Sequence, residues 1–136
     1  RTVGSLIFGM ERNLALGALE RVGLRDRIEE RVNNLSGGEQ QRVAIARLIV
    51  QDPQIVIADE PVASLDPVRA NDILSLLIKM TKQSQKTLIC SVHTEYLARK
   101  YFSRAIGIKD GTMIFDLDIA NLTNDRINSL YEMEDS

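Results

Sequence analysis

The sequence contains one cysteine among its 136 residues, so no disulfide can form within the chain. That residue, Cys90, lies in the apolar run 87–92, where a small buried thiol is expected. No apolar stretch approaches the roughly 18 residues that a membrane-spanning helix needs. No charged segment followed by an apolar one opens the chain, as a secretory signal would. The formal net charge of −2 shows no basic excess, which argues against a nucleic-acid-binding surface.

The sequence also lacks a phosphate-binding loop, which would read G-x-x-x-x-G-K followed by Ser or Thr. It begins with Arg1 rather than methionine, and its first residues show no cleavage pattern. We therefore expect it to start partway along a longer polypeptide. With 44% hydrophobic residues, the chain is long enough for one ordinary globular domain with a core.

The N-terminal part of the sequence favours helices. Leucine and valine residues among good helix formers predict a helix over 11–22, with Gly23 as a C-terminal cap. Residues 26–32 alternate charged and apolar side chains and fit either a short helix or an irregular connector. Ser36 followed by Glu39 predicts a capping box. The helix that starts there is expected to continue to residue 51, where Asp52-Pro53 stops it.

A strand–helix–strand unit is predicted next. Residues 55–58 are mostly β-branched, as in a strand buried on both faces of a parallel sheet, and 87–92 form a similar run. An apolar stripe between them predicts a helix over 67–81. Such a unit places both strands in parallel, so their carboxyl ends meet at one edge of the sheet. We further predict a helix over 95–102, a hairpin of strands 105–109 and 113–116 that turns at Asp110-Gly111, and a helix over 121–131.

The run Leu35-Ser36-Gly37-Gly38-Glu39 is the most informative motif in the sequence. A capped helix start presents free backbone amides and the positive end of the helix dipole, which together favour an anion. The two glycines carry no Cβ, so a phosphate can approach closely. The same residues also make an ordinary loop and helix cap, and the two interpretations are compatible.

Polar residues with chemical potential follow both predicted strands. Asp59 and Glu60 come directly after the first strand, at the edge where open α/β sheets bind their ligands. An acidic pair alone is more often a solvated strand end than a catalytic site. His93 ends the second strand, where a lone histidine is more often structural or merely exposed.

The order of these motifs is more specific than any one of them. A glycine-rich cap, a helix, a strand ending in Asp-Glu-Pro, Ser64-Leu65-Asp66 and a strand ending in His93 resemble, in that order from Leu35, the ATPase subunits of ABC transporters. The resemblance implies an α/β fold that is part of an ABC-ATPase, or P-loop NTPase, domain. It implies a helical signature portion over 1–51. Residues 52–136 would form the C-terminal part of the nucleotide-hydrolysing core, a mainly parallel sheet flanked by helices.

The resemblance also implies roles for three residues. The family's counterpart of Asp59 helps to hold Mg²⁺, and a carboxylate oxygen suits this hard cation. The counterpart of Glu60 is the general base that polarises the attacking water. The counterpart of His93 contacts the γ-phosphate and helps to fix that water. ATP and Mg²⁺ are therefore the implied cofactors, with Glu60 and His93 catalytic and Asp59 the metal ligand.

Other motif residues are implied to act between subunits. In the family, the segment matching Leu35 to Glu39 closes over the γ-phosphate that a second subunit holds. Ser64, Leu65 and Asp66 match the D-loop, which lies across the same interface. The implied partners are a second ATPase subunit in a head-to-tail dimer and the membrane subunits of the transporter. The implied location is the cytoplasmic face of the bacterial inner membrane, reached only through those partners, with no nucleic acid bound.

Two expectations concern what this chain does alone. The phosphate-binding loop, the glutamine-containing switch loop and the adenine-stacking aromatic of the family have no counterpart here, so the isolated chain is expected to be inactive. Glu39 stands where many members have glutamine, and its charge is expected to weaken phosphate binding slightly. The strands 55–58 and 87–92 normally pack around elements that this sequence lacks. Their uncovered apolar faces should favour self-association or rearrangement.

Longer segments are similar to the ATP-binding subunits of bacterial phosphonate importers. They are 18–24, 58–67, 91–93, 108–111 and 114–116, with a tail that contains Leu122-Thr123 and Tyr131. ATPases of other importers and of lipoprotein exporters share several of these pieces and remain alternatives. A non-catalytic module that docks on membrane subunits through its N-terminal helical segment is a further alternative. Chromosome-maintenance and break-repair ATPases are disfavoured, because no coiled-coil heptads precede Leu35.

Overall fold

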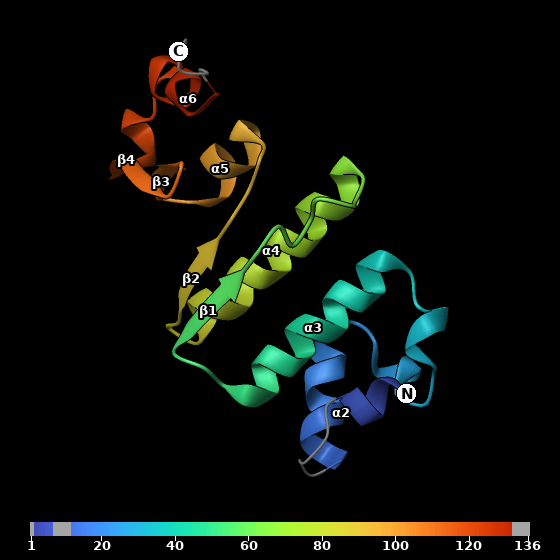
Figure 1. The fold of residues 1–136 in the computed structure, drawn as a ribbon. Helices are drawn as coiled ribbons and strands as arrows, with labels where there is room; N and C mark the ends of the chain where they lie inside the picture. Colours follow the sequence, from blue (N-terminus) through green and yellow to red (C-terminus); the bar gives the residue numbers. More distant parts are fainter. Residues whose placement is uncertain (1, 7–11, 132–136) are drawn as a thin grey trace. The chain divides into compact units, whose positions relative to one another are not determined.

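A computed structural model describes residues 2–6 and 12–131 of the chain (Figure 1). Contacts within it group the chain into two units, the first ending at His93 and the second starting at Thr94. This division differs from the boundary between 51 and 52 that the family resemblance implies, and that finer boundary stays a prediction.

The first unit begins with helices, as the sequence indicates. These elements are α1 (Val3–Leu6), α2 (Arg12–Arg21), the 3₁₀ turns η1 (Arg25–Arg27) and η2 (Val32–Asn34), and α3 (Gly37–Gln51). Helix α2 confirms the prediction over 11–22, of which Glu11 lies outside the described residues. Gly23 ends this helix with a φ of 73°, and its amide donates to the Glu20 carbonyl. The segment 26–32, for which the sequence left a short helix or an irregular connector open, is the connector. It runs from within η1 to the first residue of η2.

Helices α2 and α3 pack against each other (Figure 1). Helix α2 buries small and aliphatic side chains, including Ala18 and Leu19, and α3 buries Val43 and Ala46. The Arg42 guanidinium donates at 3.0 Å to the Val22 carbonyl, one of the acceptors that the end of α2 leaves free. Apolar burial and this hydrogen bond therefore join the two helices.

The strand–helix–strand unit is confirmed. It consists of β1 (Ile55–Ala58), α4 (Pro67–Gln83) and β2 (Thr87–Cys90). The strands pair in parallel from Ile55↔Thr87 to Ala58↔Cys90, and Asp52 ends α3 in a left-handed conformation just before Pro53. Cys90 is partly buried, and burial raises the pKa of its thiol to about 11.

The apolar run of the first strand is typical of burial on both faces, but within the described residues one face is uncovered, as expected for this chain alone. Val56 is only 3% exposed, on the side where α4 buries Ile73, Leu74 and Leu77. Ile57, by contrast, is 76% exposed. Ile55 and Ile89 are exposed as well, so one face of the β1–β2 pair is covered and the other is not.

The second unit is built on the predicted hairpin. Its elements are α5 (Glu95–Tyr101), β3 (Arg104–Lys109), β4 (Thr112–Asp118), η3 (Ile119–Asn121) and α6 (Asn124–Tyr131). Strands β3 and β4 pair with each other in antiparallel fashion. The turn residues Asp110 and Gly111 have φ values of 49° and 75°, as a two-residue hairpin turn requires. The Phe115 ring lies so close to Gly107 that a Cβ there would overlap it.

None of the helices in the described ranges is both long enough and apolar enough to cross a membrane.

The uncovered face of β1 and β2 leads to a prediction about the isolated chain. We expect it to self-associate in solution, because exposed β-branched residues and open strand edges favour contact between copies. Replacing Ile57 with lysine places a charge in the middle of this face and should shift the population toward monomer in multi-angle light scattering. Leu14→Lys, at a similarly exposed apolar residue of α2, is the control and should leave the association unchanged. A cooperative, concentration-independent monomer for the parent chain would contradict this prediction.

Candidate active site

The carboxyl ends of β1 and β2 bring polar side chains from two distant parts of the sequence together. His93 Nε2 lies 2.6 Å from Glu60 Oε1. The Ser91 hydroxyl donates to Asp59 Oδ1 at 2.7 Å. Asp59, Glu60 and His93, which the sequence singles out, therefore form one cluster, and all three side chains are exposed.

Ser91 is the member of this cluster to which the sequence interpretation assigned no role. Its hydroxyl oxygen also accepts from the Glu60 backbone amide at 2.7 Å. One hydroxyl thus contacts both acidic residues of the β1 end. The only signal in the sequence was its place two residues before His93, on the strand that pairs with β1.

The backbone at Glu60 is in the left-handed region, with φ of 45°. The following Pro61 disfavours the right-handed helical conformation for Glu60, and the usual alternative would be extended. A left-handed conformation costs a residue with a side chain about 1–2 kcal/mol. The Ser91 hydroxyl on the Glu60 amide and the Ala63 amide on the Glu60 carbonyl, at 3.3 Å, help to hold it.

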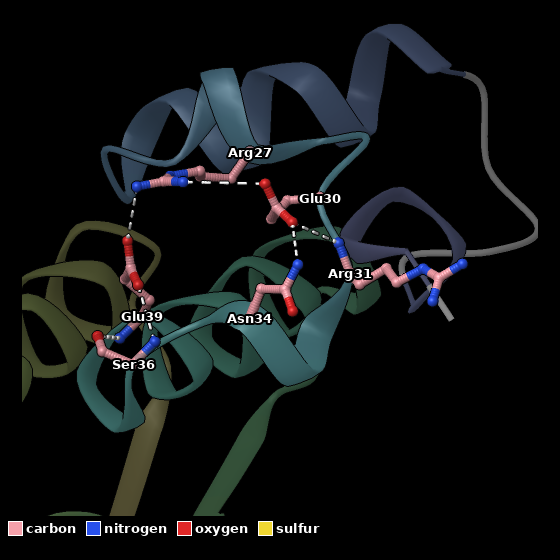
Figure 2. Close-up of polar contacts among 6 residues, drawn as sticks. All are labelled: Arg27, Glu30, Arg31, Asn34, Ser36 and Glu39. Atoms are coloured by element: carbon pink, nitrogen blue, oxygen red, sulfur yellow. Dashed lines mark hydrogen bonds and ion pairs between the residues drawn. The ribbon is translucent and has the colours of Figure 1, made fainter.

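The glycine-rich motif forms the start of α3, and its capping box is confirmed (Figure 2). The Glu39 amide donates to Ser36 Oγ at 3.2 Å, and the Ser36 amide donates to Glu39 Oε2 at 2.8 Å. Helix geometry leaves the first amides without partners inside the helix. The capping box satisfies that of Glu39, and no group in the described part of the chain accepts from the backbone amides of Gly37 and Gly38.

The Glu39 carboxylate has a second partner that the sequence did not indicate. Its Oε1 lies 3.6 Å from the Arg27 guanidinium of η1 (Figure 2). Arg27 also lies 4.0 Å from Glu30, whose Oε1 accepts from the Asn34 side chain at 2.6 Å. Hydrogen bonds from Ser36, first from its amide, together with the charge of Arg27, lower the pKa of Glu39 below its ordinary value of 4.5. The ion pair between Arg27 and Glu39 therefore links the connector to the start of α3.

Packing within residues 2–6 and 12–131 does not itself require the two glycines. A Cβ at Gly37 would lie 3.6 Å from Leu65 Cδ2, and one at Gly38 would lie 4.0 Å from Arg69 Cδ, both ordinary contact distances. Neither glycine has a left-handed φ. The same geometry places the side chain of Leu65, from the predicted D-loop, beside Gly37.

The other D-loop residues lie at the start of α4. Asp66 caps this helix, because its Oδ1 accepts from the amides of Val68 and Arg69 at 3.1 Å each. Ser64 is exposed. The segment 64–66 therefore borders the helix start of α3. In the described part of the chain, the contacts of Ser36 and Glu39 share no residue with those of Glu60 and His93.

Across residues 2–6 and 12–131, no three or more His, Cys, Asp or Glu side chains are grouped to hold a metal ion. Asp59 and the Ser91 hydroxyl do provide adjacent hard oxygen atoms. That donor set fits Mg²⁺, which proteins often hold through one or two carboxylates while phosphates and water supply the remaining ligands.

A parallel strand pair flanked by helices, with polar residues at its carboxyl edge, defines an α/β protein. The comparisons identify the family. The ABC transporter family model matches residues 9–63. The chain belongs to the ABC transporter family.

The most similar relatives include three phosphonates import ATP-binding proteins. PhnC 1 of Nostoc sp. is 44% identical over 96% of this chain and 49% of its own length. PhnC of Nocardia farcinica is 44% identical over 87% of this chain and 44% of its own length. PhnC of Mesoplasma florum is 45% identical over 89% of this chain and 49% of its own length. The chain thus spans about half the length of these relatives.

Two solved structures confirm the fold class. A putative metal-chelate type ABC transporter in an inward-facing conformation matches 96% of this chain and 58% of its own, with a TM-score of 0.85 and 22% identity. A dimeric ATP-binding cassette in a post-hydrolysis state, bound to ADP and Pi, matches 79% of this chain and 47% of its own, with a TM-score of 0.67 and 36% identity. The predicted α/β fold with a short parallel sheet flanked by helices is therefore confirmed.

The lowered pKa of Glu39 predicts a pH dependence of stability. A carboxylate whose pKa is lower in the folded chain stabilises the fold above its unfolded pKa, and this contribution is lost as the pH falls through the folded pKa. Between about pH 6 and about pH 3, the free energy of unfolding of the parent should therefore fall more than that of Glu39→Gln. Urea unfolding at each pH measures the difference.

Arg27→Gln is the matched control for this prediction, because it removes the ion pair and leaves the Ser36 contacts in place. Its pH dependence should lie between those of the parent and Glu39→Gln. Identical pH dependence in all three chains would show that the cap does not hold the Glu39 carboxylate as described.

Proposed function

We propose that this chain is the C-terminal part of the ATP-hydrolysing subunit of an ABC importer, and that the importer carries phosphonates. The observation that carries the hydrolytic part is the Glu60–His93 contact of 2.6 Å at the carboxyl edge of the parallel strands. The names of the relatives at 44% and 45% identity support the phosphonate part. The site residues proposed are those of the sequence analysis: Asp59, Glu60, His93, the segment 35–39 and the D-loop 64–66.

Glu60 is the proposed general base. Its Oε1 contacts His93, which leaves Oε2 to accept a hydrogen bond from the attacking water. A carboxylate in this position draws electron density toward the water oxygen as that oxygen attacks the γ-phosphate. His93 is proposed to contact the γ-phosphate. Its Nε2 contacts Glu60 here, so its second ring nitrogen, Nδ1, is the one proposed to face the phosphate.

Asp59 is the proposed ligand of Mg²⁺, oriented by the Ser91 hydroxyl. The bound ion would neutralise part of the phosphate charge that develops during transfer. Among the residues that directly follow the two strands, 59–61 and 91–93, the only other carboxylate is that of Glu60. Glu60 is the proposed base that contacts the attacking water.

The helix start at Ser36 is proposed to bind the phosphates of a nucleotide held by a second subunit. Gly37 and Gly38 have amides available, and no contact among the described residues explains their missing Cβ atoms. Leu65 lies beside Gly37, so the D-loop and the glycine-rich cap belong to one surface. The related cassette bound to ADP and Pi is dimeric, which supports a dimer of ATPase subunits here. The proposed location is the cytoplasmic face of the membrane, through contact with membrane subunits.

The general-base role predicts the effect of one substitution. In the full-length protein, Glu60→Gln should lower kcat for ATP about 10²- to 10⁴-fold while ATP binding is retained, because the amide accepts a proton poorly but keeps the shape. Steady-state hydrolysis and equilibrium binding of a fluorescent ATP analogue measure the two effects. Glu29→Gln, at an exposed glutamate that pairs with Arg12, is the control and should hydrolyse ATP at the parent rate.

Hydrolysis at the parent rate by Glu60→Gln would remove Glu60 as the base. The isolated 136-residue chain has no phosphate-binding loop and should hydrolyse no ATP above background. Hydrolysis by the isolated chain would overturn the proposal that it is half of an active site.

The phosphonate assignment is tested by transport. Cells that lack the gene should lose uptake of a radiolabelled alkylphosphonate, and the parent gene should restore it whereas Glu60→Gln should not. Uptake of inorganic phosphate, measured in the same cells, is the specificity control. Unchanged alkylphosphonate uptake, with loss of another solute, would reject the phosphonate assignment and leave the ATPase assignment standing.

A further inference from the structure

We infer that Ser91 is a positioning residue, whose hydroxyl holds the proposed general base Glu60 and the proposed metal ligand Asp59 in their working arrangement. The inference rests on the proposed ATPase function. It concerns a residue that touches neither the attacking water nor the phosphate in the roles assigned above.

The hydroxyl of Ser91 acts in two directions at once. Its oxygen accepts a hydrogen bond from the Glu60 backbone amide at 2.7 Å, and it donates a hydrogen bond to Asp59 Oδ1 at 2.7 Å. A hydroxyl carries one proton and two lone pairs, so both bonds can exist together. Asp59 and Glu60 are neighbours in sequence. The single Oγ atom of Ser91 bridges the Glu60 amide and the Asp59 carboxylate.

The backbone of Glu60 explains why such a bridge is needed. Its φ of 45° is unfavourable for a residue with a side chain, and the conformation persists only where surrounding contacts hold it. Pro61 disfavours the right-handed alternative, so release of the amide would let Glu60 relax toward extended backbone. That rotation would swing the Glu60 carboxylate away from His93, which it now contacts at 2.6 Å.

The position of Ser91 gives the bridge its precision. Its amide donates to the Ala58 carbonyl at 3.0 Å, which extends the parallel ladder one residue beyond the strands. The side chain is therefore placed by the sheet rather than by a free loop. Ser91 is exposed, so apolar packing does not explain the position of its side chain.

The test compares two substitutions of nearly the same shape. Threonine retains the Oγ atom, whereas valine replaces it with a methyl group, so the pair isolates the hydroxyl. In the full-length ATPase we expect Ser91→Thr to remain within about twofold of the parent in kcat. Ser91→Val should lose roughly ten- to hundredfold in kcat, with KM for ATP changed by less than about threefold, because a catalytic group would be displaced rather than substrate binding lost.

A second readout does not depend on activity. In the 136-residue chain, the Glu60 amide should exchange with solvent deuterium roughly three- to tenfold faster in Ser91→Val than in Ser91→Thr, because its acceptor is gone. Amide exchange across β1 should be the same in both variants, which excludes general unfolding. Two-dimensional amide spectra recorded in deuterated buffer resolve the individual sites.

The outcomes separate this inference from the proposed function. If the parent protein hydrolyses no ATP, the proposed function fails, and the exchange experiment alone decides whether the Ser91 bridge exists. If the parent is active and Ser91→Val retains its kcat, the positioning role is overturned. Equal losses in Ser91→Thr and Ser91→Val would also overturn it, because the hydroxyl would not be the cause.

Discussion

The parallel register of β1 and β2 is the constraint on which the candidate site depends. Ala58 pairs with Cys90, so the residues that follow each strand emerge at the same level of the sheet edge. Because side chains alternate along a strand, a slip of one residue would turn Ser91 to the opposite face. Helix α4 holds the register by covering the face that contains Val56 with its own apolar stripe. Val56 and the α4 residues that cover it lie about 20 residues apart in the sequence, roughly the length of one helix. Their packing thus determines which polar atoms meet at the sheet edge.

Local strain at this edge coincides with the proposed chemistry. Glu60 adopts a left-handed backbone directly before Pro61, and its amide, carbonyl and carboxylate all have partners. Strained backbone persists where contacts over-determine it, and it occurs frequently at catalytic sites. The other left-handed residues with side chains are Asp52, Gln85 and Asp110, each at a helix end or a tight turn. Glu60 differs because its conformation directs a carboxylate toward His93, which follows β2.

The features that could be predicted from the sequence are those set by neighbours along the chain. The Ser36–Glu39 capping box, the stop at Asp52-Pro53 and the turn at Asp110-Gly111 each depend on residues within about four positions of one another. The parallel pairing was also predictable, because a helix of the right length separates two apolar runs. Each of these features is present in the structure.

The features that could not be predicted depend on contacts between distant residues. Arg27 reaches Glu39 only through the particular path of the connector, for which the sequence left two conformations open. The double hydrogen bond of Ser91 requires both the register of the strands and the unusual φ of Glu60. The continuous apolar run of β1 indicates two covering layers but not which of its faces stays uncovered, and the described residues cover the face of Val56 and leave that of Ile57 exposed.

The arrangement of Glu39 bears on how the start of α3 can receive an anion. An extra carboxylate beside a helix start would ordinarily repel phosphate. Here both oxygens of Glu39 have partners, with Oε2 accepting from the Ser36 amide and Oε1 facing Arg27. The sequence indicated the Ser36 partner through the capping box, and Arg27 is an additional cation that offsets the carboxylate charge. The Gly37 and Gly38 amides are thus free of competition from this carboxylate for the proposed anion, and no contact among the described residues accounts for the absence of their side chains. Open space beside both glycines is what the proposed sharing of this helix start between two subunits requires.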